Sequence, residues 1–179
     1  MKGLKIRYQE QIKEKLKKQF GYTNDFSVPK IDKVVVNIGA SRALSDTRFL
    51  EVMENTLQRI TGQKPVFTRA KKSISNFKIR EGMKIGIMVT LRGQKMYDFL
   101  DKLINFALPR VRDFRGILEK SVDKGGNLSI GFKEHNAFPE IRTDEVEQIH
   151  GLEVSVKTTA KNHDEGVALL KEAGFPLVK

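Results

Sequence analysis

The feature that most restricts how this chain can fold is a strict two-residue alternation in residues 83–92. Every second position holds a large aliphatic side chain, at Ile85, Ile87, Val89 and Leu91. A side-chain period of two is typical of a β-strand that buries one face and leaves the other to water or a ligand. The intervening positions are Lys84, Gly86, Met88, Thr90 and Arg92. The sequence therefore predicts a sheet with one covered face and one open face.

Four more segments have the character of short strands. Residues 127–133 and 152–157 alternate in the same way, with Leu128, Ile130 and Phe132 and then Leu152, Val154 and Val156 at the inward positions. Residues 33–38 are rich in β-branched side chains, and residues 66–70 form another short apolar run. Both compositions favour extended structure. Together with residues 83–92, these segments predict about five strands.

Four segments have apolar residues at helical spacing. The first covers residues 8–20 and ends at Gly21, and the second begins at Ser45 or Asp46 and runs to Gly62. The third starts at Met96, and we expect it to end near Leu108 because the residue before a proline disfavours the helical region. The fourth opens with the capping-box residues Asn162 and Glu165 and ends at Gly174.

These elements predict an α+β fold, with one mostly antiparallel sheet of about five strands and about four helices on one face of it. A length of 179 residues suits a single domain. We therefore expect residues 1–179 to form one domain, from which residues 71–82 project as a long exposed loop. That loop is polar and basic, and it holds Ser73, Ser75 and Asn76.

The composition excludes several classes of protein. The chain has no cysteine, so it has no disulfide framework, thiolate zinc site or cysteine nucleophile. Its longest nearly apolar run, residues 85–91, is far shorter than the roughly 20 residues that a membrane helix needs. The N-terminus has no apolar core of a signal peptide. These features predict a soluble, cytoplasmic protein without a membrane partner.

The positive charge of the chain is concentrated in two stretches. Residues 1–20 hold seven basic and two acidic side chains, and residues 59–95 hold ten basic and one acidic. The summed charge of these two stretches exceeds the formal net charge of the whole chain, +11, because the remaining residues are slightly acidic. A solvated surface with excess lysine predicts a more even spread, whereas clustered cations indicate a nucleic-acid partner.

The open face of the predicted sheet carries small, polar or cationic side chains. They are Asn37, Lys84, Thr90, Arg92, Ser129, Gly131, Ser155 and Lys157. Asparagine and threonine can hydrogen bond to a ribose 2′-hydroxyl, so this face suits recognition of structured RNA by shape and sugar contacts. It has no aromatic residues for stacking on splayed bases. A merely solvated sheet face is polar too, which remains the alternative.

The basic loop is the sharper signal for nucleic-acid binding. Lysine and arginine side chains bind the phosphates of nucleic acids. The predicted phosphate contacts are the cations of the loop, its flanking Arg69 and two cations of the open face: Arg69, Lys71, Lys72, Lys78, Arg80, Lys84 and Arg92. Mutual repulsion predicts a loop that is mobile until an anionic partner neutralises it. Phe77 lies among the cations, where its ring can stack on a base or anchor the base of the loop.

No motif for catalysis or cofactor binding is present. The chain has no phosphate-binding glycine-rich loop, dinucleotide fingerprint, zinc-protease helix or serine-hydrolase elbow. His135, His150 and His163 have no ligand spacing, so we expect surface or loop histidines. Residues 140–147 are acidic, which fits a solvated surface, a weak cation site or a docking patch for a basic protein. We predict no enzyme, no cofactor and no metal.

Several strings in the sequence closely resemble the bacterial family of large-subunit ribosomal protein five. They occur in residues 29–39, 61–65, 68–77, 80–86, 108–116 and 136–141. Residues 157–160 and 174–176 extend the resemblance to the end of the chain. Because these uncommon strings occur in the same order and spacing, the resemblance covers essentially the whole chain.

The resemblance implies a sheet with helices on one side, similar to the RNA recognition motif. It also implies a structural protein of the central protuberance of the large ribosomal subunit, bound to 5S and 23S ribosomal RNA (rRNA). The 5S rRNA contacts of the family correspond to Asn37, Gln63, Phe77 and Thr90. Alternation had independently placed Asn37 and Thr90 on the open face.

The resemblance further implies that the basic loop extends toward the peptidyl-site transfer RNA (tRNA). Family members also contact small-subunit ribosomal protein thirteen and lie near other 5S-associated proteins. Our candidates for the protein contact are Arg110, Arg112, Glu140, Asp144, Glu145 and Glu147. An RNA-modifying enzyme would need a general base beside the loop, and a protein adaptor would need an exposed apolar patch; the sequence shows neither.

Overall fold

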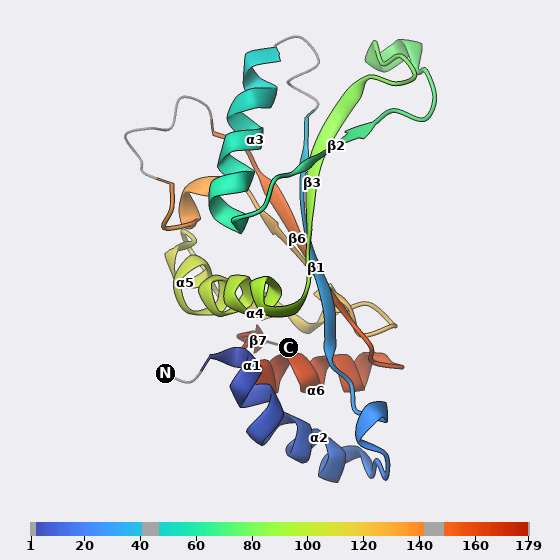
Figure 1. Ribbon diagram of the computed structural model, residues 1–179, viewed down its shortest axis with the longest axis vertical. Helices are drawn as coiled ribbons and strands as arrows, with labels where there is room; N and C mark the ends of the chain where they lie inside the picture. The colour runs from blue at the N-terminus through green and yellow to red at the C-terminus, as the bar shows by residue number, and fades with distance from the viewer. Residues whose placement is uncertain (1–2, 41–46, 142–148, 179) are drawn as a thin grey trace. The chain divides into compact units, whose positions relative to one another are not determined.

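The computed structural model describes residues 3–40, 47–141 and 149–178, and Figure 1 shows the arrangement of its elements. Five strands form an antiparallel sheet in the order β2 (Val66–Arg69), β3 (Lys84–Leu91), β1 (Ile31–Gly39), β6 (Leu152–Thr158) and β5 (Leu128–Phe132). With the helices described below, this confirms the predicted α+β fold. Its likeness to the RNA recognition motif stays a prediction. Within the described residues, no helix is long and apolar enough to cross a membrane.

The chain forms two compact units. Unit 1 consists of Met1–Val34, Leu91–Ile130 and Ser155–Lys179, and unit 2 consists of Val35–Thr90 and Gly131–Val154. Strands β3, β5 and β6 alternate in burial as the sequence predicts, whereas β2 has no buried residue. In β3, for example, Ile87, Val89 and Leu91 are buried while Lys84 is exposed.

Unit 1 begins with one continuous helix in three parts, α1 (Leu4–Arg7), a π-helical turn η1 (Tyr8–Ile12) and α2 (Lys13–Phe20). Its apolar stripe is buried at Leu4, Ile12 and Leu16. The Leu4 backbone N–H donates to Asp101 Oδ2 at 2.8 Å, which joins the start of this helix to α4 (Gly93–Lys102). Gly21 ends the helix in a left-handed conformation with φ of 68°.

The third predicted helix runs past its expected end. After α4 the chain makes a π-helical turn, η5 (Leu103–Ala107), and then a short α5 (Leu108–Arg110). The expected end near Leu108 is therefore wrong by two residues. The π-helical turn changes the hydrogen-bond spacing, so Pro109 falls in the first turn of α5, where its missing N–H is tolerated.

Helix α6 (His163–Ala173) has the predicted ends. The Asn162 side chain accepts a hydrogen bond from Glu165 N, and Glu165 Oε2 accepts one from Lys161 N. Gly174 ends the helix with φ of 103°. Unit 1 also has a small parallel ladder between β4 (Ile117–Leu118) and β7 (Leu177–Val178). The sequence did not predict it, because two residues are too few to show an alternation.

Unit 2 contains α3 (Thr47–Thr61), the antiparallel pair β2–β3 and a short turn, η7 (His135–Ala137). The buried side of α3 includes Met53, Leu57 and Ile60, as the helical spacing predicted. Gly62 follows α3 with φ of 63°. The predicted caps Ser45 and Asp46 lie outside the described residues.

Candidate nucleic-acid interface

The basic loop, residues 71–82, is an ordered hairpin rather than an open coil. At its base, Ala70 N donates to Met83 O and Gly82 N donates to Ala70 O. Nearer the tip, Ile74 and Ile79 exchange two backbone hydrogen bonds of 2.8 and 3.1 Å. The backbone is thus held by its own pairing, which sequence could not anticipate because the two isoleucines are five positions apart in a polar run.

The tip of the loop presents an aromatic ring to solvent. Residues Ser75–Phe77 make a 3-10 turn, η4, which is closed when Lys78 N donates to Ser75 O. Lys78 adopts a left-handed conformation with φ of 55°. Phe77 is 67% exposed. Of the two roles that the sequence left open for Phe77, the structure therefore excludes a buried anchor and leaves the ring free to stack.

The cations of the loop are available to a ligand. Lys71, Lys72, Lys78 and Arg80 are exposed, and so is Arg69 in β2. Among the described residues, none of these five side chains has an ion-pair partner or a side-chain hydrogen bond. Five unpaired cations therefore lie on the loop and the strand that leads into it, against the one carboxylate of Glu81, which creates a positive potential there.

Lys84 is held differently from the loop cations. A register shift between Thr68 and Arg69 brings Arg69 opposite Lys84. The Lys84 ammonium group lies 4.0 Å from the centroid of the Phe67 ring, in a cation–π contact. Lys84 remains exposed, so it can still meet a phosphate, but its position is fixed by the aromatic ring.

Two of the four predicted 5S rRNA contacts touch one another. Gln63 follows the end of α3, and its Nε2 donates to the backbone oxygen of Thr90 in β3 at 3.2 Å. The Thr61 hydroxyl accepts from Gln63 N and donates to Leu57 O, which fixes the turn that carries Gln63. The Thr90 side chain remains half-exposed. Gln63 is thereby oriented by the edge of the sheet.

Asn37 lies in β1 with a half-exposed side chain that makes no hydrogen bond to any described residue. The neighbouring strand β3 comes very close at Gly86, where a Cβ atom would lie 2.7 Å from Thr68 Oγ1 and 2.9 Å from Ile38 O. Only glycine fits there. Thr68 pairs with Gly86 and shares the outward direction, so it is a further polar group on this face that the sequence did not reveal.

The remaining residues of the open face lie in unit 1, except Gly131, which lies in unit 2 and is exposed. Arg92, Ser129 and Lys157 are exposed, Ser155 is half-exposed, and the hydroxyls of Ser129 and Ser155 are 3.3 Å apart. The face positions predicted from alternation are therefore all accessible.

The candidates for a protein contact fall in different places. Arg110 and Arg112 are exposed in unit 1. Glu140 belongs to unit 2, is half-buried, and its backbone oxygen accepts a 2.9 Å hydrogen bond from Arg59 in α3. Asp144, Glu145 and Glu147 lie outside the described residues. Within the described residues, no group of three or more side chains could hold a metal ion.

Two of the histidines expected at the surface or in loops are buried: His135 lies in the turn η7 and His150 in a segment without regular secondary structure, so the expectation of a surface position is wrong for both. His135 is 2% and His150 is 8% exposed, and their ring centroids are 4.0 Å apart. His135 Nδ1 accepts from His150 N at 3.3 Å. Burial lowers the pKa of His135, and burial together with the nearby His135 lowers the pKa of His150 to about 4. No local pattern indicated this pair, because the two residues are fifteen positions apart.

We predict that this histidine pair makes the fold sensitive to acid. A folded pKa below the unfolded value of 6.5 stabilises the protein above pH 6.5, and this stability is lost as the pH falls toward 4. The free energy of unfolding should fall by roughly 1–2 kcal/mol between pH 7 and pH 5. Urea unfolding at each pH measures this change. The double variant His135→Gln/His150→Gln should no longer show this fall in the free energy of unfolding, whereas the control His163→Gln should still show it. If the double variant and the control have the same pH dependence, the prediction is wrong.

Two protein-family models match this chain. A family model described as "Ribosomal protein L5" matches residues 24–80, and a second model, for the C-terminus of the same ribosomal protein family, matches residues 84–177. The chain is 58% identical over 173 residues to the large ribosomal subunit protein uL5 of Microcystis aeruginosa, covering 97% of each chain.

Two further relatives match the chain over nearly its whole length. The uL5 proteins of Desulforapulum autotrophicum and Halothermothrix orenii are 55% and 51% identical over 176 residues, covering 98% of each chain. The two family matches together contain residues 71–80 of the basic loop, the open-face positions of β1 and β3, and helix α6. The resemblance noted in the sequence is confirmed, and the chain belongs to the ribosomal protein L5 family.

Proposed function

We propose that this protein is a structural component of the large ribosomal subunit that binds 5S rRNA and 23S rRNA in the central protuberance. The observation that carries the proposal is the hairpin of unit 2, with five cations that have no partner among the described residues. A surface of this charge favours a polyanionic ligand, and RNA supplies a regular row of phosphates. The predicted single RNA-binding domain, residues 1–179, remains part of this proposal.

The polar face of unit 2 supplies the contacts that select RNA. Asn37 and Thr90 have hydrogen-bonding groups that can reach ribose hydroxyls, and Thr68, which fills the space beside Gly86, adds a third polar group to this face. Gln63 is held beside Thr90, and Phe77 is exposed for stacking. We therefore propose Asn37, Gln63, Phe77 and Thr90 as 5S rRNA contacts.

We propose phosphate contacts for the seven cations predicted from the sequence. They are Arg69, Lys71, Lys72, Lys78, Arg80, Lys84 and Arg92. The hairpin is the part of unit 2 best suited to reach the peptidyl-site tRNA, because its tip carries Phe77 and Lys78 beyond the paired strands (Figure 1). Backbone hydrogen bonds between Ile74 and Ile79 hold its two arms together near the tip.

The proposed protein partners are small-subunit ribosomal protein thirteen and neighbouring 5S-associated proteins, in a cytoplasmic ribosome. Exposed Arg110 and Arg112 are candidates for this contact. The acidic candidates are Glu140, Asp144, Glu145 and Glu147. Because members of the L5 family are structural proteins, the prediction that this chain is not an enzyme is confirmed.

Substitution of the open face tests the proposal. Asn37→Ala and Thr90→Ala should each weaken binding of 5S rRNA about tenfold, since each removes hydrogen bonds to the ligand that cost about 1–1.5 kcal/mol to lose. Thr90→Ala leaves intact the backbone oxygen that binds Gln63. Binding is measured by filter retention of labelled 5S rRNA, and stability by thermal unfolding.

Asn105→Ala is the matched control, because the side chain of this exposed asparagine in η5 bonds, within the described residues, only to Asp101 O. It should leave 5S rRNA binding unchanged. If the face variants bind 5S rRNA like the control, or unfold instead, the proposed role of Asn37 and Thr90 is wrong.

A further inference from the structure

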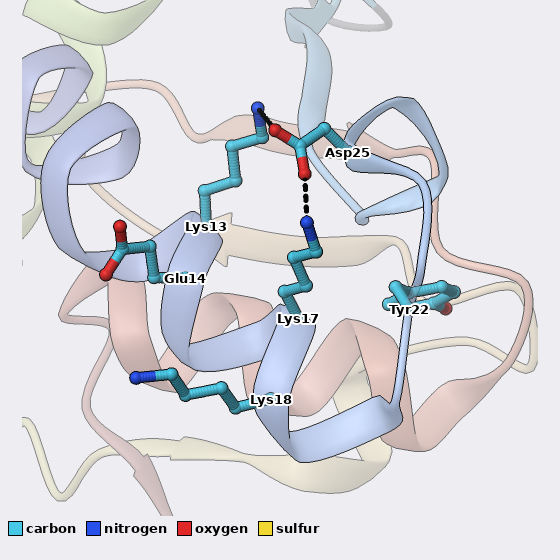
Figure 2. A pocket seen from close by; sticks show the side chains of 6 residues that line it. All are labelled: Lys13, Glu14, Lys17, Lys18, Tyr22 and Asp25. Atoms are coloured by element: carbon cyan, nitrogen blue, oxygen red, sulfur yellow. Dashed lines mark hydrogen bonds and ion pairs between the residues drawn. The ribbon is translucent and has the colours of Figure 1, made fainter.

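A second basic surface lies in unit 1, which contains none of the four proposed 5S rRNA contacts. Residues from α2 and from the segment after it line a hollow of about 540 Å³ (Figure 2). The lining side chains are Lys13, Glu14, Lys17, Lys18, Tyr22 and Asp25. This surface corresponds to the first of the two charged stretches in the sequence.

One carboxylate holds two of these lysines. Lys13 and Lys17 lie one helical turn apart, and both reach Asp25, with Nζ to carboxylate distances of 3.0 and 2.5 Å (Figure 2). Hydrogen bonds from Lys17 and Lys13 lower the pKa of Asp25. The pair of ammonium groups is thus fixed in position while one positive charge remains uncompensated.

More cations lie around this pair. Lys18 extends away from Asp25 in Figure 2 and has no ion-pair partner among the described residues. Lys161, which precedes α6, places its ammonium group 5.7 Å from the centroid of the Tyr22 ring. The surface therefore has an excess of positive charge that an extended anion can satisfy.

The residue after Asp25 has the most exposed large apolar side chain among the described residues. Phe26 is 93% exposed, and it follows Asp25 in a 3-10 turn, η2 (Asp25–Ser27). The turn is held by the Asn24 side chain, which accepts from Phe26 N at 2.9 Å. A solvated ring on a turn whose backbone is held, directly after the carboxylate that binds two lysines, is suited to stack on a base of single-stranded nucleic acid.

A membrane surface fits these residues poorly. An interfacial helix must keep its apolar stripe free to enter the lipid. Here the stripe of the α1–α2 helix is buried at Leu4, Ile12 and Leu16, which leaves the exposed Ile6 and Phe26 rather than a continuous apolar face to insert. The cations together with one exposed ring favour a nucleic acid.

We propose that Lys13, Lys17, Lys18 and Phe26 form a second RNA contact, in which the ammonium groups bind the sugar–phosphate backbone and Phe26 stacks on an unpaired base. The choice of RNA as the ligand rests on the proposed rRNA-binding function. Asp25 competes with the phosphates for Lys13 and Lys17, so it limits the strength of this contact while it keeps the lysines in place.

The test uses the full chain and two labelled probes, dodecauridine and a twelve-base-pair RNA duplex, with fluorescence anisotropy at several salt concentrations. The variant Lys13→Gln/Lys17→Gln/Lys18→Gln should lower the slope of log affinity against log salt for both probes by about 2. The matched control is Lys120→Gln/Lys124→Gln/Lys171→Gln, which removes equal charge elsewhere in unit 1. It should change the slope by less than half as much.

Further variants test separately whether Phe26 stacks on a base and whether Asp25 competes with phosphates for the lysines. Phe26→Ala should weaken dodecauridine binding about tenfold and duplex binding much less. Its control is Phe106→Ala, which removes another exposed ring of unit 1. Asp25→Asn should tighten binding of both probes about threefold at low salt, and Asp164→Asn, with the same charge change on α6, should tighten it less.

Equal effects of the lysine variant and its control, or of Phe26→Ala and Phe106→Ala, would overturn this inference. Binding to phosphatidylglycerol vesicles that depends on Phe26, with unchanged RNA binding, would assign the surface to lipid and overturn it too. The proposed 5S rRNA function depends on Asn37 and Thr90. Each set of variants can therefore fail without the other.

Discussion

Replacing Lys71, Lys72, Lys78 and Arg80 together by glutamine is expected to weaken binding of the peptidyl-site tRNA to assembled ribosomes about a hundredfold. The four side chains have no partners among the described residues, so they contribute their full charge to an RNA ligand. Each phosphate contact adds about 0.7–0.9 to the slope of log affinity against log salt. The slope should therefore fall by about 3.

The measurement is titration of labelled tRNA onto ribosomes reconstituted with each form of the protein, at several salt concentrations. Binding of free 5S rRNA by the same variant should fall less, because Asn37, Gln63 and Thr90 remain. Equal losses for tRNA and 5S rRNA would show that the hairpin has no separate partner.

A charge-preserving variant is the control for the hairpin. Lys71→Arg/Lys72→Arg/Lys78→Arg keeps every positive charge and should bind both RNAs with nearly the affinity of the parent protein. Because the loop cations pair with no described residue, neither variant should change the unfolding temperature. A loss of stability in the glutamine variant would mean that the side chains support the hairpin rather than bind RNA.

Gly166→Ala is expected to destabilise the protein by about 3 kcal/mol, the largest effect of any single substitution considered. Gly166 in α6 packs against the backbone of Gly126, and a Cβ atom at Gly166 would lie 2.6 Å from Gly126 O and closer still to Gly126 Cα. The Gly126 oxygen also accepts a 2.8 Å hydrogen bond from Thr158 Oγ1. The turn therefore cannot retreat without breaking that bond.

Urea unfolding of the variant and its parent measures the loss. Gly131→Ala is the control, because a Cβ atom there has no neighbour within 4 Å and its φ is not positive. It should change the free energy of unfolding by less than about 0.5 kcal/mol. If both alanine variants have the same stability, α6 can move away from Gly126 and the close backbone contact is not needed.

Local patterns in the sequence were sufficient for most of the fold. The alternation in residues 83–92 predicted which side of β3 is buried, and the Asn162–Glu165 capping box predicted the start of α6. Such signals succeed because they depend on neighbours within a few residues, where geometry is fixed by the period of the element. The predicted end of the third helix was wrong because a π-helical turn places Pro109 in the first turn of α5, where proline is tolerated.

The candidate site was predictable in kind but not in detail. Charge clustering indicated the hairpin, and alternation indicated Asn37 and Thr90. Neither pattern predicted the bond from Gln63 to Thr90, the cation–π contact of Lys84 with Phe67, or the pairing of Ile74 with Ile79. Each of these contacts requires the register of particular strands or turns.

By itself, the sequence determined the main helices and the strands of the five-stranded sheet, the buried face of the alternating strands, the concentration of positive charge in two stretches and the resemblance to the L5 family. Only the tertiary structure decided that His135 and His150 are stacked in the interior, that Phe77 and Phe26 face solvent, and that Asp25 holds Lys13 and Lys17. The physical reason is that burial and pairing depend on residues distant in the chain, whereas the periods of helices and strands depend on residues nearby.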